Sequence, residues 1–144
     1  MWQTLIAVLG TLAGVGITGT YQARATRTAR AEDRRTAGLT AVTALVEALA
    51  DHRRAMWARE DLRLTGQDWS EARTESHRTR SALTGPLLQV QLLMPSVARP
   101  ARDAADAAYA LRGHDDHTHL AASREVAIRT SDELVAAVGR HLAT

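Results

Sequence analysis

The chain has 144 residues and a net charge of +2, which is enough for one domain and leaves little room for a second. All eighteen basic residues are arginine, cysteine is absent, and aromatic residues make up only 3%. The lack of cysteine excludes a disulfide scaffold, a thiolate zinc site and a cysteine nucleophile. The 28 alanines and the scarcity of aromatic residues favour helices over sheets.

Residues 1–23 contain no charged side chain. Trp2 and Tyr21 bracket this run, 19 residues apart. A helix of that length spans roughly 28 Å, close to the ~30 Å hydrocarbon core of a bilayer. Aromatic rings at both ends are typical of residues at the membrane interface. We therefore predict a transmembrane anchor over residues 1–22.

A basic segment follows the apolar run, and we expect it to form a juxtamembrane helix over residues 23–37. Its five arginines face only two acidic residues: they are Arg24, Arg27, Arg30, Arg34 and Arg35. The positive-inside rule then predicts a single-pass protein of the cell membrane, with the N-terminus outside and the C-terminus in the cytoplasm. Residues 24–35 carry a net charge of +3 and the 109 residues after them carry −1. Because the basic excess is juxtamembrane, lipid headgroups are its expected partner, and no nucleic-acid partner is expected.

Two other interpretations of the apolar run remain open. Ala23-Arg24-Ala25 resembles a signal-peptide cleavage site, although the positive n-region of a signal peptide is missing. The run is also compatible with a buried core helix of a soluble helical bundle.

The predicted span carries small residues at helical spacing. Gly10 and Gly14 form a G-x-x-x-G motif, and Thr18 extends the same ridge. Small residues at this spacing let two helix backbones approach in a bilayer, so the ridge predicts self-association. Glycines that are merely tolerated in the span are the alternative.

The remaining residues, 38–144, predict a helical bundle. Apolar residues recur every three or four positions up to about residue 64, where Gly66 is expected to end the first helix. Further helices are predicted from a capping box at 68–71 to Pro95, over 96–112 and over 118–142. The predicted fold is all-α: one transmembrane helix continuous with an antiparallel cytoplasmic bundle of three to four helices. Arg53 and Glu60 interrupt the first apolar seam, which weakens a coiled-coil interpretation.

No catalytic, cofactor or metal site is predicted, and we do not expect an enzyme. Residues 114–119 (HDDHTH) hold three histidines and two aspartates, but they lack a known metal-binding spacing and favour a helix-capping loop. The isolated histidines, His52, His77 and His141, are expected on the bundle surface. Trp57 and Trp69 flank the predicted turn at Gly66 and are expected to pack together, with a partner-binding role as the alternative.

Several segments resemble a known family. They are LIAVLGTLAG at 5–14, YQARA at 21–25, AVTAL at 41–45 and DHRRAMW at 51–57. In these segments the chain is similar to the KilB-like small membrane proteins of actinobacterial conjugative plasmids. The resemblance implies an accessory factor in the intercellular spread of a plasmid, acting by self-association or by docking other plasmid-transfer proteins. The resemblance assigns no function to any particular residue of this chain.

A holin-like or otherwise lethal membrane protein is the alternative function. Such a protein would oligomerise through the same span and damage the membrane. A single span followed by a large bundle fits a scaffold better than a pore, and no polar face lines the helix beyond Gln3, Thr4, Thr11 and Thr18.

Overall fold

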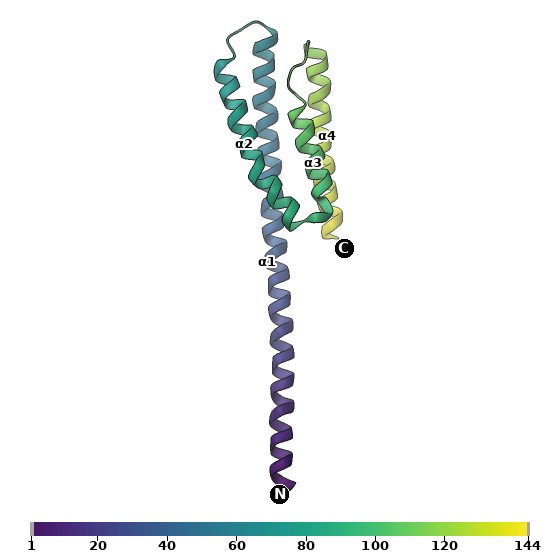
Figure 1. The fold of residues 1–144 in the computed structure, drawn as a ribbon. Helices are drawn as coiled ribbons and strands as arrows, with labels where there is room; N and C mark the ends of the chain where they lie inside the picture. The colour runs from purple at the N-terminus through teal and green to yellow at the C-terminus, as the bar shows by residue number, and fades with distance from the viewer. Residues whose placement is uncertain (1, 144) are drawn as a thin grey trace. The chain divides into compact units, whose positions relative to one another are not determined.

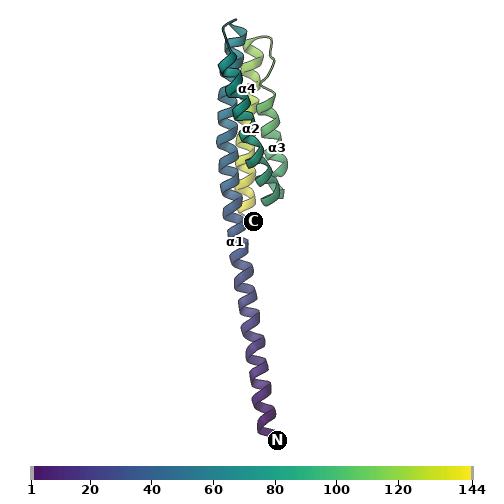
Figure 2. The ribbon, with the colours of Figure 1, turned by 60° about the vertical axis from the view of Figure 1, so that its left-hand side comes forward.

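A computed structural model describes the backbone of residues 2–143 and the side chains of residues 26–143. The helices are α1 (Trp2–Leu64), α2 (Ser70–Leu93), α3 (Ala98–Tyr109) and α4 (His117–Leu142), with a 3-10 turn, η1 (Pro95–Val97), before α3. The chain divides into two compact units, residues 1–36 and residues 37–144. In the second unit four helices pack antiparallel, with α1 beside α2 and α3 beside α4 (Figures 1 and 2). The predicted all-α class is confirmed.

Glycine ends α1 as predicted. Gly66 has a φ of +71°, a conformation that residues with a β-carbon rarely adopt. The N–H of Gln67 donates to the carbonyl of Leu62 at 2.9 Å, and the N–H of Gly66 donates to Arg63 at 3.2 Å. These bonds satisfy carbonyls that the end of a helix leaves without partners.

The predicted capping box at the start of α2 is wrong in detail. Trp69, not Asp68, occupies the N-cap position, and it makes no side-chain capping bond. Asp68 lies one residue further out, where its carboxylate accepts the N–H of Ser70 at 3.0 Å and the Ser70 hydroxyl at 2.5 Å. These hydrogen bonds lower the pKa of Asp68. The third predicted helix also begins later than residue 96, because η1 precedes it.

The apolar seams form the core largely as predicted. Small side chains of α3 are buried against leucines of α1, α2 and α4, so the helices approach closely. The members that α1 to α4 contribute include Leu45, Leu49, Leu83, Val90, Ala101, Ala104, Ala108, Leu134 and Val138. Two residues expected to face inward are instead exposed: Leu39 at 37% and Val135 at 51%.

The predicted anchor cannot be followed at the level of side chains. Residues 1–22, with Trp2, Tyr21, Gly10, Gly14 and Thr18, lie outside the residues whose side chains are described, as does Arg24. From residue 26 onward, no helix is both long enough and apolar enough to cross a bilayer.

Candidate functional site

The described part of the basic segment lies on α1. Arg27, Arg30, Arg34 and Arg35 are all exposed there. Their side chains are therefore accessible, and their predicted role toward lipid headgroups stays a prediction.

The histidine-rich segment connects α3 to α4 and caps α4. Asp116 is the N-cap residue, and its carboxylate accepts the backbone N–H of His119 at 2.8 Å. This bond and the contact of Asp116 with the His119 ring lower the pKa of Asp116. The His117 ring reaches across to Asp61, with 2.9 Å between Nε2 and Oδ1. Among residues 26–143, no three or more His, Cys, Asp or Glu side chains gather where a metal ion could bind.

His52 contradicts the expectation of a surface residue. It is only 1% exposed, and its Nδ1 lies 3.0 Å from the Thr79 hydroxyl of α2. The spacing carried this signal, because His52 follows Leu49 by three residues and precedes Met56 by four, on the buried seam. His77 and His141 are exposed as predicted.

The predicted packing of Trp57 against Trp69 is not found. Each ring instead contacts arginine side chains. Arg59 and Arg73 both contact the Trp69 ring, with guanidinium carbons 5.3 Å and 5.6 Å from its centroid. Trp57 faces α4, with Arg124 at 5.4 Å. Stacking on guanidinium groups stabilises both rings without contact between them.

Glu60 forms a buried ionic network that sequence reasoning did not find. Its carboxylate is fully buried and lies 2.8 Å from Arg63 Nε and 3.6 Å from Arg59 Nε. It also accepts the backbone N–H of Gly113 at 3.2 Å, while Arg63 donates to the carbonyl of His114. Glu60 therefore joins the end of α1 to the connection between α3 and α4.

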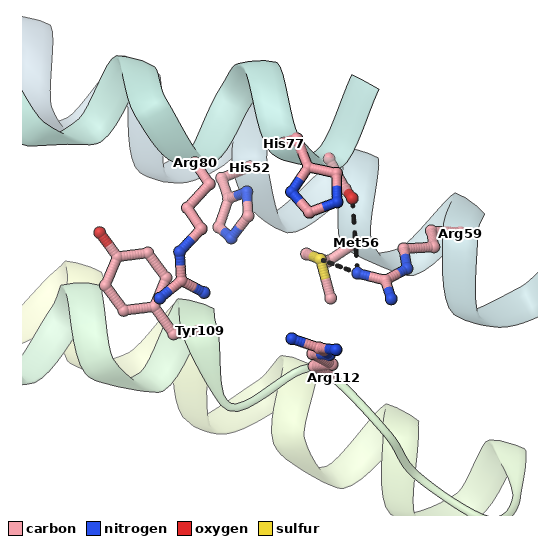
Figure 3. A pocket seen from close by; sticks show the side chains of 8 residues that line it. His52, Met56, Arg59, His77, Arg80, Tyr109 and Arg112 are labelled. Atoms are coloured by element: carbon pink, nitrogen blue, oxygen red, sulfur yellow. Dashed lines mark hydrogen bonds between the residues drawn. The ribbon is translucent and has the colours of Figure 1, made fainter. Parts of the chain in front are cut away.

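A basic cavity of about 160 Å³ opens beside this network, between α1, α2 and the end of α3 (Figure 3). Some of the side chains that line it are buried and others are exposed. The lining residues are His52, Met56, Arg59, Ser76, His77, Arg80, Tyr109 and Arg112. Helical spacing places residues 52, 56 and 59 on one face of α1, and residues 76 and 80 on one face of α2. Only the folded bundle brings these two faces together with Arg112.

The cavity has a strongly positive environment. No aspartate or glutamate lines it. Burial, together with the charges of Arg80 and Arg59, lowers the pKa of His52 to about 4. Burial also lowers the pKa of Arg59; the charge of Glu60 opposes this shift and that of Arg112 adds to it. Arg80 lies over the Tyr109 ring, 4.2 Å from its centroid.

Comparison with known proteins identifies the family of this chain. The protein-family model for the KilB plasmid transfer protein matches residues 39–142. These residues include Glu60 and the whole lining of the basic cavity. The chain belongs to the KilB family. Protein KilB of Streptomyces lividans is 55% identical over 143 residues, covering 97% of each chain. No solved structure matches.

Family membership confirms the KilB part of the resemblance inferred from the sequence and supports a role in plasmid transfer. It indicates no enzymatic activity. The match to the family model covers the helical bundle, whereas the similarity to the Streptomyces lividans protein also covers most of the uncharged N-terminal residues.

Proposed function

We propose that this KilB-family chain is a non-enzymatic, single-pass membrane protein whose cytoplasmic bundle assists the intercellular transfer or spread of a plasmid. The observation that carries the membrane anchor is the uncharged run of residues 1–23 followed by five arginines within twelve residues. The family membership carries the role in plasmid transfer.

The anchor is tested by fractionating cells that express the full chain and washing the membranes with high salt and with alkali. Retention of the chain in the washed membranes is the expected result, because a spanning helix is held by apolar contact with lipid rather than by charge. Release by the alkaline wash would contradict the anchor.

The orientation is tested by single cysteines, since the chain has none of its own. Thr4→Cys lies at the outer end of the predicted anchor, and Ala121→Cys is on the exposed surface of α4. In protoplasts, a membrane-impermeant maleimide is expected to label Thr4→Cys and to label Ala121→Cys only after lysis. The reverse pattern would invert the proposed topology, and labelling of both before lysis would exclude a bundle enclosed by the membrane.

Self-association through the span is the next part of the proposal. Gly10→Leu and Gly14→Leu place large side chains on the small-residue ridge and are expected to reduce the oligomer seen in detergent. Gly16→Leu is the matched control, because two residues correspond to about 200° around a helix and put Gly16 on the opposite face from Gly14. Equal loss of oligomer in all three variants would contradict a specific interface.

The same variants separate the scaffold from the lethal membrane protein. A scaffold is expected to let cells grow normally when the chain is overproduced. Toxicity that Gly10→Leu and Gly14→Leu abolish, and Gly16→Leu retains, would favour the lethal protein instead.

A further inference from the structure

The basic cavity holds positive charge that its own residues do not neutralise. Arg80 and Arg112 form no hydrogen bond or ion pair with the side chains of residues 26–143; Arg80 lies on α2 and Arg112 in the connection between α3 and α4. Arg59 has one carboxylate nearby, Glu60 at 3.6 Å, but its Nε is buried without a hydrogen-bond partner. Three guanidinium groups surrounding one space form a strong site for an anion with several oxygens.

The cavity also contains one unused hydrogen-bond acceptor. The Thr79 hydroxyl lies 3.1 Å from the carbonyl of Glu75 and 3.2 Å from that of Ser76, so it donates to the backbone. It therefore accepts from His52 Nδ1–H, and His52 Nε2 carries the lone pair. That atom is buried without a partner. The lowered pKa of His52 keeps the ring neutral at pH 7, so Nε2 stays an acceptor.

We infer that the cavity binds an oxyanion that retains an O–H group, and that hydrogen phosphate is the ligand that fits this arrangement. The charged oxygens accept hydrogen bonds from Arg59, Arg80 and Arg112, whose guanidinium groups lie around the space in Figure 3. The P–O–H group donates to His52 Nε2. Because a water molecule takes roughly 30 Å³ in the liquid, a cavity of about 160 Å³ has room for a phosphate group of five heavy atoms.

This arrangement predicts selectivity as well as affinity. Sulfate has the same shape and charge as hydrogen phosphate but carries no O–H at neutral pH, so it would leave His52 Nε2 unpaired against an anionic oxygen. A phosphate monoester loses its last proton at a pKa of about 6. At pH 8 it therefore also has no O–H group to donate to His52 Nε2. Inorganic phosphate retains one O–H at that pH.

The test is a titration of the purified full chain with inorganic phosphate in an uncharged detergent, at pH 8 and constant ionic strength, by calorimetry. Saturable binding at one site is expected, with sulfate and glycerol 3-phosphate each binding about tenfold or more weakly, since each leaves a buried acceptor unpaired. No saturable binding of phosphate would overturn the inference. Equal binding of sulfate, or tighter binding of the monoester, would overturn it as well.

Two variants assign the binding to this cavity. Arg112→Gln removes an exposed side chain that makes no hydrogen bond or ion pair within residues 26–143, so the fold is expected to be retained. It should weaken phosphate binding about tenfold or more. Arg102→Gln removes the same charge from an exposed position on α3 outside the cavity and should leave the affinity unchanged. Equal weakening in both variants, or none in Arg112→Gln, would overturn the assignment; circular dichroism of each variant confirms that it is folded.

Discussion

The two halves of the bundle bury different kinds of side chain along the same helix. Between residues 41 and 49, α1 contributes only aliphatic side chains such as Leu45 and Leu49 to the core. From residue 52 to residue 60 it buries His52, Arg59 and Glu60 as well. Aliphatic burial is non-directional, whereas a buried polar group is costly unless its partners are in place. We call the part of the bundle around residues 52–60 the polar half and the part around residues 41–49 the aliphatic half. The polar half therefore depends on specific pairs and on pH in a way that the aliphatic half does not.

The largest expected effect comes from removing the central acid of the polar half. Glu60→Ala leaves Arg59 and Arg63 without their carboxylate and the N–H of Gly113 without its acceptor. Breaking a buried ion pair in this way is expected to lower the free energy of unfolding by about 3–5 kcal/mol. The measurement is urea unfolding of the full chain in an uncharged detergent, followed by helical circular dichroism.

Glu133→Ala is the matched control for that change. Glu133 is an exposed acid on α4, so its loss should change the free energy of unfolding by less than about 0.5 kcal/mol. Similar values for the two variants would show that the Glu60 network does not stabilise the polar half.

The second prediction concerns the pH dependence that His52 gives to this half. Its pKa is about 4 in the folded chain against an ordinary value of 6.5. Below pH 6.5 the unfolded chain gains a proton that the folded chain does not, so stability falls between pH 6.5 and pH 4. The two values correspond to a loss of about 3 kcal/mol.

His52→Gln has no titrating ring and should lack this part of the pH dependence. Carboxylates contribute to the acid unfolding of both proteins, so the informative quantity is the difference in unfolding free energy between wild type and variant at pH 4 and at pH 7. A difference that is the same at both pH values would contradict the lowered pKa of His52.

The third prediction tests the aliphatic half through close contact. A β-carbon at Gly38 would lie 2.9 Å from Met94 Cγ, at the end of α2. Gly38→Ala should be nearly neutral, because Met94 is flexible and alanine gains about 1 kcal/mol of helix propensity over glycine. Gly38→Leu should lower the free energy of unfolding by about 1–3 kcal/mol through overpacking. Equal stability of both variants would show that Met94 does not pack closely on this helix.

The sequence predicted the aliphatic half far better than the polar half. Periodicity alone identified Leu83, Val90 and Ala104 as core residues, because burial of apolar surface repeats every three or four positions. The same spacing applied to His52, but a polar residue was assumed to face solvent. Its burial depends on Thr79, which is 27 positions away in the chain.

The cavity and the Glu60 network were beyond sequence reasoning for a related reason. Glu60 was recognised only as an interruption of the apolar seam, and its partner Gly113 lies 53 residues further along the chain. Arg112 is a single charged residue in a turn, with no local pattern around it. Contacts of this kind are specified by how the helices meet rather than by any one helix.

The smallest expected effect is at the surface of the polar half, where Arg124 lies over the Trp57 ring. An exposed cation–π contact contributes about 0.5–1 kcal/mol, well below the loss expected for Glu60→Ala. Arg124→Gln should therefore lower the free energy of unfolding by about that amount, and Arg129→Gln, an exposed arginine on the same helix, by less. In a double-mutant cycle with Trp57→Leu, the contact should appear as a coupling of about the same size. Zero coupling would mean that only the buried pairs distinguish the polar half from the aliphatic one.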